Sequence, residues 1–248
     1  MKNAEEFRNW RIERASELAN DDSFTKTSLT WIDEAIRMDY SYMFEWFGVP
    51  TIQFPADLLL IQEAIFKSKP NVVIEIGIAR GGTTLFLATI MKAIATNSSF
   101  SVIGVDISIS EHTRQSIETT EYSSAICLIE GNSISIETFE KIKNCISPSD
   151  KVLVILDSNH TKDHVLSEME LYSSLVSKDS YLIVMDTAIE YISPKSIPSN
   201  RPWSRGNSPL SAVEEFVARN SRYYQLDYDL NNRSLPGAAK GGYLRKLH

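Results

Sequence analysis

Short apolar runs alternate with amphipathic stretches through the middle of the chain. Each run has the length of a strand and few polar interruptions, as in strands that helices cover on both faces. The stretches between the runs repeat their apolar residues at helical spacing. This alternation predicts an α/β fold with a doubly wound parallel sheet. The five runs are 72–76, 101–106, 125–130, 151–156 and 181–185.

The pattern is different before the first run. Residues 1–47 predict helices that finish in an aromatic cluster between Tyr40 and Phe47. We favour packing of this cluster against the main domain. The alternative is a substrate lid or a contact between copies, because aromatic side chains are common at both. Gly48-Val49-Pro50 breaks the pattern, so we divide the chain into an N-terminal helical and aromatic extension, 1–50, and one domain, 51–248.

A proline-rich loop, 190–207, follows the fifth run. A loop of this length in a compact domain is usually functional or disordered. Ser208 then has the position of a helix N-cap, with proline directly after it. The rest of the chain predicts a helix to about residue 219, a sixth strand over 222–230, a turn-rich connection over 231–242 and a closing strand over 243–247.

Acidic residues stand at or next to the carboxyl ends of the predicted strands. Ligands bind outside this edge of a doubly wound sheet, so the acids predict a binding site there. They are Glu75, Asp106, Glu130 (followed by Gly131-Asn132-Ser133), Asp157 and Asp186.

The first strand leads through a glycine turn into a helix. Gly77 allows a sharp turn, while Gly81 and Gly82 let a ligand approach the backbone, where the first helix amides point at it. These glycines do not form the G-x-G-x-x-G dinucleotide pattern. Without that pyrophosphate cradle, and with Glu75 and Asp157 close by, the turn favours the cationic S-adenosylmethionine over NAD.

The expected S-adenosylmethionine site spans the ends of several strands. Asp106 can accept hydrogen bonds from both ribose hydroxyls, and the adenine is expected near Asn132 and Ser133. For Glu75 the alternative is a buried, paired structural carboxylate. The expected cofactor-binding residues are Glu75, Gly77, Arg80, Gly81, Gly82, Thr83, Asp106, Ile107, Asn132, Ser133 and Asp157.

A second group of residues predicts chemistry. Asp157 and Asp186 end two strands that we expect to be neighbours, about 5 Å apart, and two carboxylates there would suit Mg²⁺ or Ca²⁺. A metal would lower the pKa of a bound hydroxyl. His160 lies three residues past Asp157 and could take that proton. An equally weighted alternative is that His160 only forms a hydrogen bond to a neighbour at the start of a helix. His164, one turn further along, is the second candidate for the base.

Composition restricts the partners and the cellular compartment that we expect for the protein. The chain has 248 residues, 43% of them hydrophobic, and a net charge of −7, which argues against a nucleic-acid partner. No apolar run reaches the length of a membrane helix, and the first residues have no signal-peptide core. We therefore expect a cytoplasmic protein without a membrane partner. Cys127 and Cys145 are expected to be reduced core residues.

Several short motifs, in a constant order, resemble the cephalosporin hydroxylase-like family. This family contains S-adenosylmethionine-dependent O-methyltransferases of cephamycin and rhamnosyl type. The resemblance covers roughly residues 46–248. Its motifs are Gln53-Phe54-Pro55-Ala56-Asp57-Leu58, Gln62-Glu63, Pro70 to Gly77 with Gly81-Gly82, Asp157-Ser158-Asn159-His160 with His164, Leu171-Tyr172, Ser180-Tyr181-Leu182, Asp186-Thr187, Pro202-Trp203, Asn207-Ser208-Pro209 and Gly241-Gly242-Tyr243-Leu244-Arg245.

The resemblance implies a Rossmann-like, seven-stranded class I methyltransferase sheet with helices on both faces, a divalent metal, transfer to a hydroxyl and a homo-oligomer. In related macrolide-sugar methyltransferases the base is a histidine three residues past the metal-binding aspartate, where this chain has His160. His164, Arg201 and Trp203 would contact the acceptor. Family members often have Glu-Asp where this chain has Met185-Asp186, and a thioether is a poor magnesium ligand.

The main hypothesis is a Mg²⁺-assisted O-methyltransferase that acts on a sugar hydroxyl of a glycan, a nucleotide-sugar or a natural-product glycoside. The alternative is a non-catalytic S-adenosylmethionine-binding subunit that assists a partner enzyme in natural-product tailoring. The third hypothesis, a nicotinamide dehydrogenase, predicts affinity for NAD, which the absent dinucleotide pattern disfavours.

Overall fold

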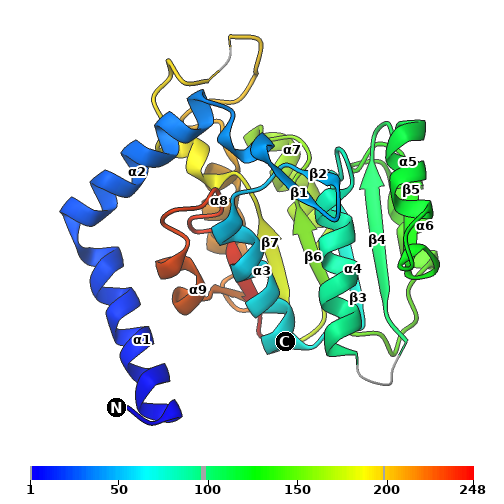
Figure 1. Cartoon of the computed structure of the whole chain (residues 1–248), viewed down its shortest axis with the longest axis horizontal. Coiled ribbons are helices and arrows are strands. Elements are labelled where there is room, and N and C mark those ends of the chain that lie inside the picture. Colours follow the sequence, from blue (N-terminus) through cyan, green and yellow to red (C-terminus); the bar gives the residue numbers. More distant parts are fainter. Residues whose placement is uncertain (1, 96–98, 198) are drawn as a thin grey trace.

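The computed structural model describes residues 2–95, 99–197 and 199–248. Its main feature is a seven-stranded sheet in the order β5-β4-β3-β6-β7-β9-β8 (Figure 1). The first five strands of that order run parallel, and β9 is antiparallel to both of its neighbours. The strands are β3 (Val72–Ile76), β4 (Ser101–Asp106), β5 (Ile126–Glu130), β6 (Val152–Leu156), β7 (Tyr181–Val184), β8 (Tyr224–Leu226) and β9 (Tyr243–Lys246). The doubly wound sheet predicted from the apolar runs is confirmed.

Helices cover both faces of the sheet. The side chains of α3 (Pro55–Ser68), α4 (Gly82–Ile94) and α9 (Tyr228–Arg233) pack on one face, with α3 and α4 in front of the strands in Figure 1. The other face packs against α6 (Ile136–Asn144), α7 (Lys162–Tyr172) and α8 (Pro209–Asn220). The remaining helix of this domain, α5 (Glu111–Glu118), follows β4. Burial on both faces explains why β3, β6 and β7 consist of apolar residues almost throughout.

The N-terminal segment forms an arm and a hairpin. The arm comprises α1 (Ala4–Asn20) and α2 (Asp22–Arg37). α1 lies beside α9 (Figure 1), and the buried residues of α2 pack on residues that follow β7. After the short 3₁₀ helix η1 (Tyr40–Met43), β1 (Phe44–Trp46) and β2 (Val49–Thr51) pair as a hairpin that the sequence pattern did not predict. This hairpin spans residue 50, and the division of the chain there stays a prediction.

The aromatic cluster packs on the domain, as we favoured. Tyr40 contacts the Phe44 and Phe54 rings, and Trp46 meets Phe86 of α4 edge to face at 5.0 Å between centroids. The Trp46 indole also donates a hydrogen bond to Thr89. Tyr42 and Phe47 remain exposed. The packing therefore holds the hairpin on α4 through only part of the cluster.

Two local predictions differ from the structure. The sixth strand is shorter than 222–230, because the Asp227 side chain accepts the amide of Leu230 and begins α9. Cys127, on the edge strand β5, is only partly buried against the core, and Cys145 is exposed at the end of α6; both are free, and their sulfurs lie 4.0 Å apart. The 3₁₀ helix η3 (Thr187–Glu190) ends where the predicted loop over 190–207 begins, and Pro198 of that loop lies outside the described residues. A further 3₁₀ helix, η2 (Ser123–Ala125), precedes β5.

Within the described ranges, none of the helices combines the length and apolar character needed to cross a membrane.

Candidate active site

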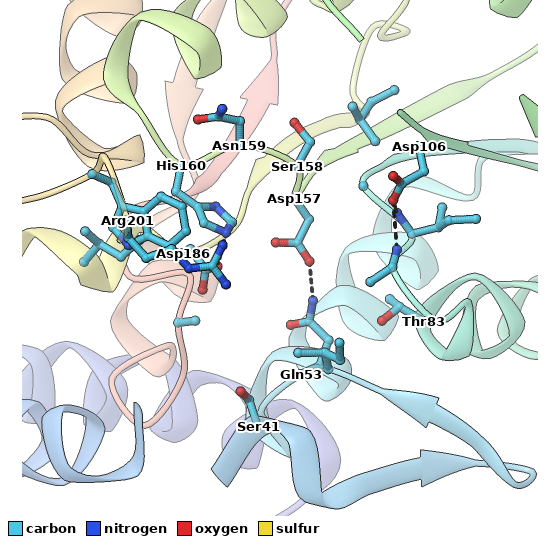
Figure 2. Close-up of a pocket in the computed structure, with 18 of the residues that line it drawn as sticks. Ser41, Gln53, Thr83, Asp106, Asp157, Ser158, Asn159, His160, Asp186 and Arg201 are labelled. Carbon is cyan, nitrogen blue, oxygen red and sulfur yellow. Dashed lines mark hydrogen bonds and ion pairs between the residues drawn. The ribbon is translucent and has the colours of Figure 1, made fainter. Parts of the chain in front are cut away.

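A cavity of about 550 Å³ lies at the carboxyl ends of the parallel strands. Its two ends differ in chemistry, as Figure 2 shows. Asp106 and Thr83 lie at one end, His160, Asp186 and Arg201 at the other, and Asp157 between them. Residues from the N-terminal arm, the strand ends and the loop over 190–207 all line it. We call the end with Asp106 the donor end and the end with His160 the catalytic end.

The glycine turn is shaped by close packing. Gly77 has φ +93°, and a Cβ there would lie 2.2 Å from the carbonyl oxygen of Asp157. A Cβ at Gly82 would lie 2.3 Å from the carbonyl oxygen of Pro50, in β2. Gly82 therefore lets the hairpin approach α4, a structural reason that differs from the ligand approach we predicted. Both glycines also line the cavity.

Asp106 closes this turn from the neighbouring strand. One of its carboxylate oxygens accepts the amides of Ile78 and Ala79, at 3.1 and 3.0 Å, as Figure 2 shows. The other oxygen accepts the amide of Ser108 at 3.2 Å. Asp106 thus faces the cavity at the predicted position. Of the other residues predicted for the cofactor, the cavity lining includes Gly77, Gly82, Thr83, Ile107, Asn132, Ser133 and Asp157.

Glu75 is placed differently. It lies on β3 with 1% of its surface exposed, and the hydroxyl of Thr84 donates to it at 2.5 Å. Burial raises the pKa of this carboxyl to about 8, and the nearby charge of Asp106 acts in the same direction. The described cavity lining does not include Glu75, Arg80 or Gly81. This geometry favours the alternative for Glu75, a buried structural carboxyl group.

At the catalytic end, β6 and β7 are neighbours and bring Asp157 and Asp186 together as predicted. One ligand atom each from Asp157, His160 and Asp186 lie within 4.8 Å of one another. The His160 Nε2 lies 3.1 Å from a carboxylate oxygen of Asp186. Burial, followed by the charge of Asp186, raises the pKa of Asp157 well above its usual range. A cation among these groups would relieve that repulsion.

The loop over 190–207 reaches this end of the cavity. The Trp203 ring meets the His160 ring edge to face at 4.7 Å, and the Arg201 guanidinium lies 4.8 Å from the Trp203 centroid. Figure 2 shows Arg201 directed towards Asp186 and His160. The structure therefore brings Trp203 and Arg201, two of the residues predicted to contact the acceptor, next to His160, the predicted base.

Gln53, in the family motif that leads into α3, was not recognised as part of the site, and Asp57, on the first turn of α3, was not recognised as a buried neighbour of the site. The Gln53 amide donates to Asp157 at 2.6 Å (Figure 2). Asp57 is fully buried, and burial raises its pKa to about 7, with the charge of Asp186 adding to the shift. Their polar character next to the start of an apolar helix was the available signal. Asp39, Ser41 and Tyr42 also line the cavity, although the sequence pattern did not single them out individually.

The side chains of Met185 and His164 have different surroundings from those that the sequence predicted. Met185 packs in the core cluster beneath α3 and α4 and is 2% exposed, so its thioether does not face the catalytic end. His164, predicted to contact the acceptor, has its Nε2 3.0 Å from the hydroxyl of Ser133 and 3.1 Å from Glu168. It therefore lies against the donor end, although it lines the cavity.

A family model described as rhamnosyl O-methyltransferase/CmcI matches residues 38–247. The chain belongs to this family. The resemblance drawn from the short motifs is confirmed, and so is the enzyme class, an S-adenosylmethionine-dependent O-methyltransferase.

Among curated relatives, the rhamnosyl O-methyltransferase of Mycobacterium leprae is 32% identical over 57% of this chain, and the match spans 59% of that protein. The Mycobacterium tuberculosis enzyme of the same name is 27% identical over 80% of this chain and 76% of its own length.

Solved structures share the fold. A CmcI structure described with Mg and SAM superposes with a TM-score of 0.60 at 18% identity, over 84% of this chain and 78% of that one. An O-methyltransferase from Bacillus cereus in complex with SAH gives a TM-score of 0.54 at 13% identity, over 90% of this chain and 91% of its own. The class I methyltransferase sheet is thereby confirmed.

Proposed function

We propose that this enzyme methylates a hydroxyl group of a sugar, with help from a divalent cation. The observation that carries the proposal is the meeting of Asp157, His160 and Asp186 at one end of a cavity whose other end is the glycine turn. The names of the curated relatives support a sugar acceptor.

The donor end suits S-adenosylmethionine. Asp106 faces the cavity and can accept the ribose hydroxyls in the manner of the acid after the second strand of nucleotide-binding folds. Asn132 and Ser133 line the same cavity and would border the adenine. The carboxylates of Asp106 and Asp157 favour a cationic ligand over a pyrophosphate. When bound, S-adenosylmethionine supplies an electrophilic methyl group and a neutral sulfur leaving group.

The catalytic end suits Mg²⁺. Asp157 and Asp186 offer hard oxygen ligands, which Mg²⁺ prefers over imidazole. Asp157 would bind in place of its hydrogen bond from Gln53. A bound cation would supply positive charge that lowers the pKa of the acceptor hydroxyl.

His160 is the proposed base. Its contact with Asp186 orients the ring on one side, and the edge-to-face contact with Trp203 holds it on the other. A ring fixed in this way can take the proton of the acceptor hydroxyl at one nitrogen as the oxygen forms its new bond to carbon. Trp203, Arg201 and Tyr42 provide the aromatic and polar surface that a sugar would contact.

The proposal is tested by transfer of a labelled methyl group to a panel of rhamnosides and other glycosides, with Mg²⁺ or with EDTA. We expect transfer to depend on the metal, and Asp157→Asn to lower kcat by about 100-fold or more. Asp163→Asn, an exposed aspartate on α7, is the matched control and should keep full activity.

Two outcomes would contradict the proposal. Undiminished transfer by Asp157→Asn in EDTA would exclude the metal and base scheme. Binding of S-adenosylhomocysteine without transfer to any glycoside, but with stimulation of a separate enzyme, would favour the non-catalytic subunit instead.

A further inference from the structure

A buried polar chain connects the two ends of the cavity. The hydroxyl of Ser158 donates to the Glu168 carboxylate at 2.5 Å, and His164 Nε2 lies 3.1 Å from the same oxygen. The same His164 nitrogen lies 3.0 Å from the hydroxyl of Ser133. Glu168 has no surface exposed to solvent. The contacts therefore connect Ser133 to His164, His164 to Glu168, and Glu168 to Ser158.

Ser133 and Ser158, the first and last residues of this set of contacts, belong to different loops of the site. Ser133 follows β5 and borders the donor end, whereas Ser158 directly follows Asp157, which lies between the two ends and joins His160 and Asp186 in one group. One face of α7 holds them together, because His164 and Glu168 are one turn apart. Tyr172, a further turn along, donates its hydroxyl to the carbonyl of Ser133 at 2.6 Å.

A gain in folding stability does not by itself explain why the Glu168 carboxylate is buried here. Taking a carboxylate fully out of water is costly, and an apolar residue of similar size is often as stable in such a place. The second carboxylate oxygen of Glu168 has no hydrogen-bond partner among the described residues. The gain from Glu168 lies instead in its direct contact with Ser158 in one loop and in its contact through His164 with Ser133 in another.

We propose that Glu168 is a positioning residue that holds the donor end and the catalytic end of the cavity in one fixed relation. Through His164 it orients Ser133 beside the adenine, and through Ser158 it fixes the loop that carries Asp157 and His160. Glu168 itself touches neither substrate nor cofactor. This inference rests on the proposed function, because it takes the two ends as the donor and acceptor sites.

The two contacts of Glu168 can be broken separately. His164→Asn removes the donor contact, so we expect the Kd for S-adenosylhomocysteine and the KM for S-adenosylmethionine to rise about 10-fold, with kcat within twofold. Ser158→Ala removes the catalytic contact, so kcat should fall about 10-fold while the Kd for S-adenosylhomocysteine stays unchanged. Glu168→Gln keeps the shape of the side chain but replaces the carboxylate with a weaker, neutral acceptor, so it should show both effects to a smaller degree.

The matched control is Glu170→Gln. It makes the same chemical change on the same helix, at an exposed carboxylate that pairs with Arg219. We expect its Kd, KM and kcat to equal those of the unchanged enzyme. Calorimetric titration with S-adenosylhomocysteine, steady-state kinetics and Tm are measured for all four variants in the full-length protein.

The inference is decided by whether the Kd for S-adenosylhomocysteine and kcat change separately in the His164→Asn and Ser158→Ala variants. Glu168→Gln with unchanged Kd and kcat would overturn it, as would His164→Asn and Ser158→Ala variants that lose binding and turnover in equal proportion. If Glu168→Gln does not fold, the other two variants still decide, because both keep the carboxylate. An unchanged enzyme that binds no S-adenosylhomocysteine would overturn the proposed function itself, and this inference with it.

Discussion

Glu75 and Asp57 carry carboxyl groups that are buried almost completely, and burial raises the pKa of both. In each case a single hydrogen-bond donor replaces water: the Thr84 hydroxyl for Glu75 and the Ala238 amide for Asp57. The pKa of Glu75 is about 8 in the folded protein and 4.5 in its ordinary range. This difference makes stability depend on pH.

We expect Glu75→Gln to stabilise the protein increasingly as the pH rises from about 4.5 to 8. Above pH 4.5 the unfolded chain loses this proton while the folded protein keeps it, so the raised pKa costs stability in that range. At pH 7 the cost is on the order of 3 kcal/mol. The amide can still accept the Thr84 hydrogen bond.

Urea denaturation at pH 5 and pH 8 measures this effect. Glu118→Gln, at an exposed position of α5, serves as the control and should not change the pH dependence. A Glu75→Gln protein that is equally destabilised at both pH values would show that the carboxylate is charged and paired in the folded state.

Among single residues, the site residues at the strand ends could be predicted from the sequence. Asp106, Asp157 and Asp186 follow apolar runs, and parallel strands always bring their carboxyl ends to one edge. Gln53 was not predictable as a partner of Asp157. The two are far apart in sequence, and only the packing of α3 against the sheet brings the amide within 2.6 Å.

At the scale of elements, the β1–β2 hairpin and α4 depend on the absence of a side chain at Gly82. A Cβ there would approach two atoms of β2, the Pro50 carbonyl oxygen at 2.3 Å and the Thr51 hydroxyl at 2.2 Å. Backbone atoms cannot move aside as a flexible side chain can. The hairpin would have to leave its place over the donor end.

We therefore expect Gly82→Ala to destabilise the protein by about 1–3 kcal/mol and to increase hydrogen exchange in residues 44–51. Gly48→Ala is the comparison, because no atom lies within 4 Å of its added Cβ and only its φ of +80° opposes the change. Its cost should be about 1–2 kcal/mol, without the increase in exchange across residues 44–51 that separation of the hairpin from α4 would cause. Unchanged exchange across the hairpin in Gly82→Ala would contradict this role of the glycine.

At the scale of the whole molecule, ligands should stabilise the fold in a fixed pattern. The donor end lies between β3, β4, β5 and the N-terminal hairpin, so a ligand there joins segments that are distant in sequence. A ligand at 100 times its Kd adds about 2.7 kcal/mol, equivalent to roughly 5–10 °C in a domain of this size.

We expect S-adenosylhomocysteine to raise Tm by this amount, Mg²⁺ to add to the shift, and NAD to leave Tm unchanged. Differential scanning calorimetry measures all three, with Asp106→Asn as the variant in which the shift should shrink. An equal shift with NAD would contradict the choice of S-adenosylmethionine. The homo-oligomer implied by the family resemblance stays a prediction, which sedimentation analysis would check.

The order of apolar runs and acids along the chain by itself determined the parallel sheet, its binding edge and the predicted roles of Asp157, His160 and Asp186. Such features follow from local periodicity and from the rule that parallel strands share one carboxyl edge. Tertiary structure alone decided the rest. It buried the Glu75 side chain in the core and brought the Gln53 amide within hydrogen-bonding distance of Asp157. It also connected Ser133 to Ser158 through His164 and Glu168. These contacts join residues distant in sequence, and no local pattern specifies which of them the packing of helices on the sheet will bring together.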